Sequence, residues 1–179
     1  NGSGKSTILK AISREIRSYH GYISEVRLDE LSYLPQNLES PPFLTVFDVV
    51  RTGFYDKTMG NEEELASTDD LLRQCGVHSV KQRTFADISA GEQQRVWLAF
   101  VIAQSRDLIL MDEPLSSVDL LSRRGFYRLL MDISGNGKTL IVVTHDLEMA
   151  VEYGHHIIYL DQGIKKFEGD PESFRQWYW

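Results

Sequence analysis

The sequence has little of what marks a secreted or membrane-spanning protein. It contains one cysteine, Cys75, in 179 residues, so no disulfide can form within the chain, as is usual in a reducing compartment. We expect Cys75 to be a small buried residue near a helix end. No apolar run approaches the roughly 20 residues that a membrane-spanning helix requires. Acidic residues outnumber basic ones by 26 to 19, and the net charge of −7 disfavours broad binding to a nucleic-acid backbone, although a local basic patch is permitted.

What is present is an ordinary globular composition, 42% apolar and 25% charged. At 179 residues the chain can form one domain with a sizeable core, and it has room for a subdomain. We find no internal repeat, low-complexity tract or coiled-coil heptad. Length and composition therefore indicate a globular protein of about one domain, and its function has to be inferred from the motifs.

The chain begins with the second half of a phosphate-binding loop, G-x-x-x-x-G-K-[ST]. Gly2 and Gly4 let the backbone curl so that its N–H groups converge on phosphate oxygens. Lys5 supplies a positive charge for the phosphates, and the Ser6 hydroxyl can ligate Mg²⁺. We expect the first glycine of the pattern and a buried strand to precede Asn1. The candidate phosphate-binding residues are Asn1, Gly2, Ser3, Gly4, Lys5, Ser6 and Thr7.

A helix must follow such a loop, because the free N–H groups and dipole at its N-terminus complete the anion site. The spacing of Ile8, Leu9, Ile12 and Ile16 predicts one apolar helical face that continues to Gly21. The alternative for this segment is a glycine-serine turn before an amphipathic helix. The rest of the chain has to decide between the two.

The pattern of strands and helices predicts an α/β protein with a mainly parallel sheet and an inserted α-helical subdomain. Strands are expected at 22–28 and 31–34, and apolar strands at 108–111 and 139–143 flank a helix at 120–133. We expect the strand at 108–111 to be buried on both faces, and we also treat the wholly apolar strand at 139–143 as buried.

The section 42–104 has almost no strand signal and predicts helices, including one capped by Thr45 and another over 62–74. We therefore assign residues 1–41 and 105–179 to an α/β core and 42–104 to the helical subdomain. The chain closes with a hairpin over 157–167 and a helix that Asp170 caps.

Two carboxylates follow the strand at 108–111, where ligands of open α/β sheets bind. Asp112 is a candidate Mg²⁺ ligand, and Glu113 can polarise an attacking water. His145 follows the next apolar strand and from there can reach a γ-phosphate, while Gln36 follows Pro35 and can present its amide oxygen to Mg²⁺ or water. Each has a structural alternative, namely a capped turn for the carboxylates, a structural histidine, and an ordinary loop glutamine.

Another helix N-terminus, at residues 88–95, offers a second candidate anion site. Ser89, Ala90 and Gly91 form a small-residue turn before a predicted helix, so backbone N–H groups are available there. The alternative is a plain capping box, because Ser89 and Glu92 have the S-x-x-E spacing.

Taken in order, these motifs resemble those of the ATP-binding cassette (ABC) family of ATPases, and the resemblance covers nearly the whole chain. Asn1–Thr7 resembles the family's Walker A loop, Gln36 its Q-loop and Ser89–Glu92 its signature. Leu108–Glu113 resembles the Walker B motif, Ser116–Asp119 the D-loop and His145 the switch histidine. The resemblance implies a P-loop NTPase fold and an ATPase that uses ATP and Mg²⁺, with Ser6, Gln36 and Asp112 at the metal and Glu113, Gln36 and His145 in catalysis.

The resemblance also implies a dimer in which each ATP lies between the Walker A loop of one copy and the signature of the other. Ser89, Gly91 and Glu92 would then face the partner's nucleotide, and Asp119 would contact the partner. The chain differs from the family's LSGGQ signature at Ala90, which replaces the first glycine, and at Glu92, which replaces the glutamine. We expect weaker contacts across the dimer from these changes, with activity retained.

The leading hypothesis is that the chain is the ATPase subunit of a transporter that imports a metal ion, an iron chelate or cobalamin. The sequences of residues 33–36 and 45–50 resemble those of such importers. Its implied partners are a second copy of the ATPase, membrane permease subunits and a substrate-binding protein, at the cytoplasmic face of the cell membrane and without nucleic acid. The alternative is a non-transport ABC ATPase that acts in DNA repair or on the ribosome. The 52 residues between Gln36 and Ser89 leave no room for a long coiled-coil insertion.

Overall fold

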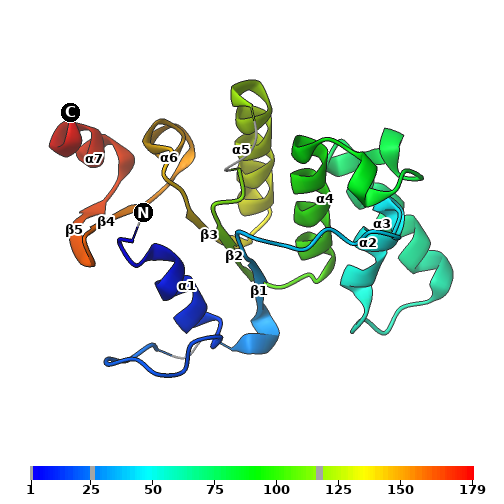
Figure 1. Ribbon diagram of the computed structural model, residues 1–179, viewed down its shortest axis with the longest axis horizontal. Helices are drawn as coiled ribbons and strands as arrows, with labels where there is room; N and C mark the ends of the chain where they lie inside the picture. The colour runs from blue at the N-terminus through cyan, green and yellow to red at the C-terminus, as the bar shows by residue number, and fades with distance from the viewer. Residues whose placement is uncertain (1, 25–26, 116–118) are drawn as a thin grey trace.

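The computed structural model describes residues 2–24, 27–115 and 119–179, and its centre is a parallel sheet. The sheet is three-stranded in the order β1-β2-β3, formed by β1 (Leu31–Leu34), β2 (Leu108–Asp112) and β3 (Thr139–Val143). Leu110 of β2 pairs with Tyr33 on one side and Ile141 on the other. The predicted α/β fold with a parallel sheet is confirmed (Figure 1).

Helices cover both faces of the sheet because alternate residues of β2 point to opposite sides. On one face, α1 (Lys5–Ile12) places Leu9 against Leu110 and Val143. On the other face, Ile109 and Met111 belong to the large core that α4 (Ala90–Ala103) and α5 (Leu120–Gly135) share. Figure 1 shows α1 on one side of the strands and α4 and α5 on the other. The apolar run of β2 is therefore buried on both faces, as predicted.

The helical section consists of α2 (Val46–Arg51), α3 (Asn61–Gln74) and α4, with short 3-10 turns between them. Thr45 caps α2 in a reciprocal capping box with Asp48. Within the described residues of this section, an isolated bridge between Thr45 and Thr84 is the one β pairing. Val46, Leu72 and Val96 lie in the same hydrophobic cluster as Ile109 and Met111, so this section and the sheet share one core.

The C-terminal part comprises α6 (Leu147–Tyr153), a hairpin of β4 (Ile157–Asp161) with β5 (Ile164–Gly169), and α7 (Pro171–Tyr178). The hairpin strands are antiparallel, as predicted. Asp170 caps α7 through Ser173, and Pro171 occupies the first turn, where no N–H partner is needed. Phe174 of α7 is fully buried against Val151 and Ile157. Within the described part of the chain, no helix has the length and hydropathy to cross a membrane.

Three local predictions are wrong. The strand expected at 22–28 is not found in the described part of that segment: residues 22–24 and 27 lie outside any strand, and Leu28–Glu30 form a 3-10 turn. Arg27, just before this turn, pairs with Asp29 and Glu30. The first helix ends at Ile12 and not near Gly21, because Arg14 takes a left-handed conformation with φ 62° that a helix cannot continue. The strand at 139–143 is only partly buried, with Ile141 39% exposed, because β3 is an edge strand of the described sheet.

Candidate nucleotide site

The loop before α1 has the backbone that a phosphate-binding turn requires. Gly2 and Gly4 have φ of 87° and 89°, in the left-handed region that side chains rarely adopt. A Cβ on either residue would meet no neighbour within 4 Å, so conformation and not space demands glycine here. Gly4 is the N-cap of α1 and has no side chain to cap it, which leaves the first N–H groups to a ligand. Asn1 lies outside the described residues.

Lys5 and Ser6 begin α1 and present the polar side chains of the loop. The Lys5 ammonium donates to the Ser3 hydroxyl over 2.8 Å. The Ser6 hydroxyl donates to Oδ1 of Asp112 over 2.9 Å, although the two residues are 106 positions apart. Asp112 is 2% exposed at the end of β2. The two strongest sequence motifs therefore meet, and a hydroxyl and a carboxylate are oxygen ligands of the kind Mg²⁺ prefers.

Tyr33 of β1 is a partly buried ionisable residue on which the charge of Asp112 acts. Its hydroxyl is buried without a hydrogen-bond partner in the described structure. Burial, with the negative charges of Asp112 and Glu15, raises the Tyr33 pKa to about 12, so the phenol is neutral at pH 7. The described residues hold no cluster of three or more His, Cys, Asp or Glu side chains around a possible metal. The donor set fits a metal whose remaining ligands are phosphate and water.

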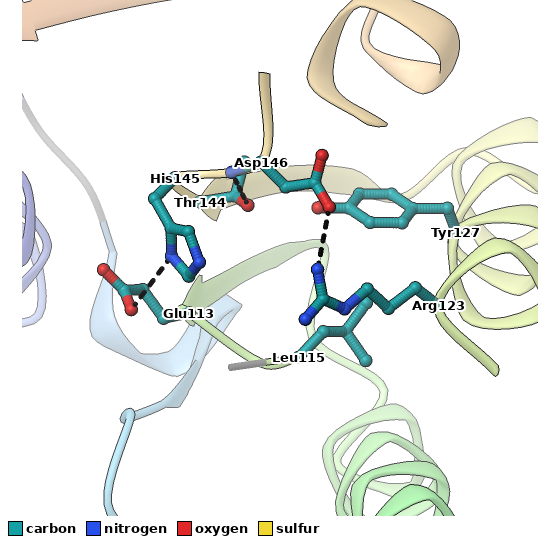
Figure 2. Close-up of a pocket in the computed structure, with 7 residues that line it drawn as sticks. All are labelled: Glu113, Leu115, Arg123, Tyr127, Thr144, His145 and Asp146. Atoms are coloured by element: carbon teal, nitrogen blue, oxygen red, sulfur yellow. Dashed lines mark hydrogen bonds and ion pairs between the residues drawn. The ribbon is translucent and has the colours of Figure 1, made fainter. Parts of the chain in front are cut away.

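Glu113 lies at the meeting point of three strand ends. Its backbone N–H donates to the carbonyl of Val143 over 2.9 Å, and its φ of 48° turns the chain sharply out of β2. Its side chain is 14% exposed. Gln36, which follows β1, donates from Nε2 to Oε2 of Glu113 over 3.1 Å. His145, which follows β3, places Nδ1 3.4 Å from the same oxygen (Figure 2). The structure thus brings together all three side chains that we predicted for catalysis.

Sequence reasoning missed the residues behind His145. A small cavity of about 10 Å³ is lined by Glu113 and His145 and by five further residues: Leu115, Arg123, Tyr127, Thr144 and Asp146. Arg123 and Tyr127 come from α5, where their i, i+4 spacing places them on one face. The available signal was that Thr144 and Asp146, both polar, flank His145 directly. Spacing on one helix could not show that this face meets them.

At the second candidate anion site, the polar groups of Ser89 and Glu92 are hydrogen-bonded to each other. Ser89 caps α4 and its Oγ accepts from the Glu92 N–H over 3.3 Å, while Oε2 of Glu92 accepts from the Ser89 N–H over 2.8 Å. The hydrogen bonds from Ser89 hold the pKa of Glu92 below its ordinary value, so Glu92 is ionised at pH 7. Gly91 lies in the first turn. The structure therefore contains the capping box, and α4 lies across the sheet from α1 (Figure 1).

Asp119 begins α5 as its N-cap and accepts from the Ser122 N–H over 3.1 Å. The three residues before it, Ser116–Val118, lie outside the described part, so the predicted D-loop can be placed only at its last residue. Asp119 is exposed. The hydrogen bonds given above for Asp119, Ser89 and Glu92 are all made at the starts of their own helices.

A glycine loop at a helix N-terminus, facing carboxylates at the ends of parallel strands, defines a P-loop nucleotide-binding protein. The profile of the family described as ABC transporter matches residues 1–116. The chain therefore belongs to the ABC transporter family, as an ATP-binding and ATP-hydrolysing subunit. The resemblance seen in the motifs is confirmed.

Similar proteins include two ATP-binding subunits of import or transport systems. The iron(3+)-hydroxamate import ATP-binding protein FhuC of Bacillus subtilis is 34% identical over 94% of this chain and 69% of its own length. The zinc transport system ATP-binding protein TroB of Treponema pallidum is 36% identical over 90% of this chain and 65% of its own length. This chain thus spans about two thirds of their length.

A solved structure supports the fold independently. The ATP-binding cassette MJ0796, seen as a dimer in a post-hydrolysis state with ADP and phosphate, matches 94% of this chain and 81% of its own, with a TM-score of 0.81 and 28% identity. The architecture that the motifs predicted is therefore found in a nucleotide-bound relative.

Proposed function

We propose that this protein is the ATPase subunit of an importer for a metal ion or a metal chelate. The observation that carries the catalytic part is the meeting of Gln36, Glu113 and His145 at the carboxyl ends of β1, β2 and β3, beside the Ser6–Asp112 pair. The substrate class rests on relatives that are named for iron-hydroxamate import and zinc transport.

Glu113 is the proposed general base for the attack of water on the γ-phosphate. Its carboxylate is mostly shielded from solvent, and Gln36 and His145 both contact Oε2, which fixes its orientation. Residues Gly2–Thr7 would hold the phosphates, with Lys5 supplying the charge. Ser6 and Asp112, together with Gln36, would hold Mg²⁺, which would supply positive charge to neutralise the phosphates.

The proposed active form is a dimer. The α4 end, with Ser89, Gly91 and Glu92, lies away from α1 within the chain, so it can serve a nucleotide only on another copy. Asp119, exposed at the start of α5, would contact that copy. The dimeric relative bound to ADP and phosphate supports this arrangement.

The remaining proposed partners are permease subunits and a substrate-binding protein, with the ATPase bound peripherally at the cytoplasmic face of the membrane. Phe43 and Tyr55, in the helical section 42–104, are 92% and 95% exposed. Exposed aromatic side chains of this kind suit a surface that another protein covers. We propose that this section is the subdomain that receives the permease, and that 1–41 and 105–179 form the α/β core.

Uptake by cells tests the proposal. A strain that lacks the full-length gene would receive the wild-type gene, Glu113→Gln or the control Lys10→Ala, and uptake of labelled zinc and labelled ferric chelates would be measured. We expect the wild type and the control to restore uptake of one of these substrates and Glu113→Gln to restore none. Wild-type protein that hydrolyses ATP but restores uptake of neither would refute the substrate class.

A further inference from the structure

His145 needs support from its neighbours, because its own side chain is held weakly. The imidazole is 59% exposed, and its contact with Glu113 is 3.4 Å long. Its direction therefore depends on the backbone of residues 144–146. Figure 2 shows that this segment runs between Glu113 on one side and the Arg123 and Tyr127 side chains of α5 on the other.

On the C-terminal side of His145, Asp146 joins two helices. Its Oδ1 accepts from the Met149 N–H over 3.1 Å and so caps α6. Its Oδ2 accepts from Nη1 of Arg123 over 3.2 Å. Both side chains of this ion pair are largely shielded, with 27% of Arg123 and 19% of Asp146 exposed, so solvent screens the pair less than a surface one. Asp146 is therefore held at the start of α6 and against α5 at once.

On the N-terminal side of His145, Thr144 also lies against residues of the turn and of α5. Its Oγ1 accepts from the Asp146 N–H over 3.0 Å, which closes a tight turn around His145. Tyr127 lines the same small cavity as Thr144 and Asp146, and burial raises the pKa of its phenol above the ordinary value, so the phenol stays neutral. Tyr127 is 6% exposed and stacks on Tyr153 of α6 with ring centroids 5.5 Å apart. The ring is thus fixed independently of Thr144.

We propose that Arg123 and Tyr127 are positioning residues that hold the turn 144–146 so that His145 faces Glu113. The inference rests on the proposed function, in which His145 takes part in hydrolysis. Small displacements at a reacting centre lower the rate steeply, whereas ATP binding depends on the separate loop at α1. The two residues should therefore affect turnover much more than ATP affinity.

The first test is steady-state ATPase kinetics of the full-length protein carrying Arg123→Ala. We expect kcat to fall about tenfold while KM for ATP changes less than about twofold. Arg124→Ala is the matched control, because Arg124 is adjacent on α5 and pairs with Glu152 of α6 but not with residues 144–146. An equal loss in Arg124→Ala would overturn the proposal.

A double-mutant cycle asks whether Arg123 acts through His145. In a His145→Ala background, Arg123→Ala should lower kcat by less than about twofold, because there is no imidazole left to position. A second full tenfold loss would show that Arg123 acts elsewhere. If His145→Ala alone retains wild-type kcat, the proposed role of His145 in hydrolysis is wrong as well. This single variant therefore distinguishes an error in the proposed function from an error in the proposed positioning role of Arg123.

Two conservative changes complete the test. Tyr127→Phe removes the hydroxyl from the cavity that Thr144 and Asp146 line but keeps the ring on Tyr153, and should lower kcat about threefold with KM unchanged. Arg123→Lys should recover part of the activity that Arg123→Ala loses, because a charge near Asp146 is restored. If Arg123→Ala does not fold, as judged by circular dichroism, Tyr127→Phe and Arg123→Lys carry the test, and wild-type kcat in both would refute the proposal.

Discussion

Two helix N-termini in this chain carry the residues of candidate anion sites, and the polar groups of the two ends find their hydrogen-bond partners in different ways. At the start of α1, the Ser6 hydroxyl bonds Asp112, which is 106 residues away, and Glu113 beside it is contacted from two other strand ends. At the start of α4, Ser89 and Glu92 bond each other within a single turn.

The difference shows that a helix end becomes a site only when the fold brings other groups to it. The α1 end faces carboxylates that can hold a metal and activate water. The α4 end is capped by its own residues and Ser89 is exposed, so in the proposed dimer its ligand would come from the other copy. The variants below probe each end, from the largest expected effect to the smallest.

Glu113→Gln is the substitution at the α1 site for which we expect the largest loss of ATPase activity. The amide keeps the shape of the side chain but cannot accept a proton, so kcat for ATP should fall at least about 100-fold. The ATP-bound dimer should persist, which size-exclusion chromatography with ATP would detect. Wild-type turnover in this variant would remove Glu113 as the base.

Lys5→Ala tests the phosphate end of the same site. Loss of a charged hydrogen-bond donor should weaken ATP binding by about 10- to 100-fold, measured by calorimetry on the full-length protein. The matched control is Lys10→Ala, because Lys10 lies in the last turn of the same helix. Equal losses at both positions would indicate a general charge effect and argue against a specific loop.

Ser6→Ala tests the link between the loop and β2. Removal of the hydroxyl that bonds Asp112 should raise the Mg²⁺ concentration for half-maximal ATPase activity by about tenfold, at the scale of one hydrogen bond to a charged group. Ser13→Ala, just beyond the other end of α1, serves as the control. An unchanged Mg²⁺ requirement would mean that Ser6 is structural.

Glu92→Gln tests the α4 end and should have the smallest effect. Glutamine also completes a capping box, so the fold should be kept, while removal of a negative charge should tighten ATP-dependent dimerisation by about two- to fivefold. Because the Glu92 pKa is lowered in the folded state, the wild type gains stability from ionised Glu92 above the ordinary glutamate pKa and loses it as pH falls through the lowered value. Thermal unfolding at pH 7 and pH 3 would measure this, and a gap between variants that widens in acid would contradict it.

Much of the fold could be predicted because its causes lie close together in the sequence. The apolar run of β2 and the caps at Thr45, Ser89 and Asp170 all depend on neighbouring residues. The candidate site residues could be predicted for a related reason: carboxyl ends of parallel strands share one edge of a sheet, so side chains that follow those strands are neighbours.

The tertiary structure decided what local pattern could not. Residues 22–28 have strand composition, but a strand forms only with a hydrogen-bonded neighbour, and the described part of that segment turns instead through Arg27 and its carboxylate partners. The positions of Arg123 and Tyr127 beside residues 144–146 were equally hidden, since they depend on how α5 packs against the end of β3. The sequence by itself determined which groups are available for ATP chemistry. Only packing determined which of them meet, because distances between remote residues are set by the shared core.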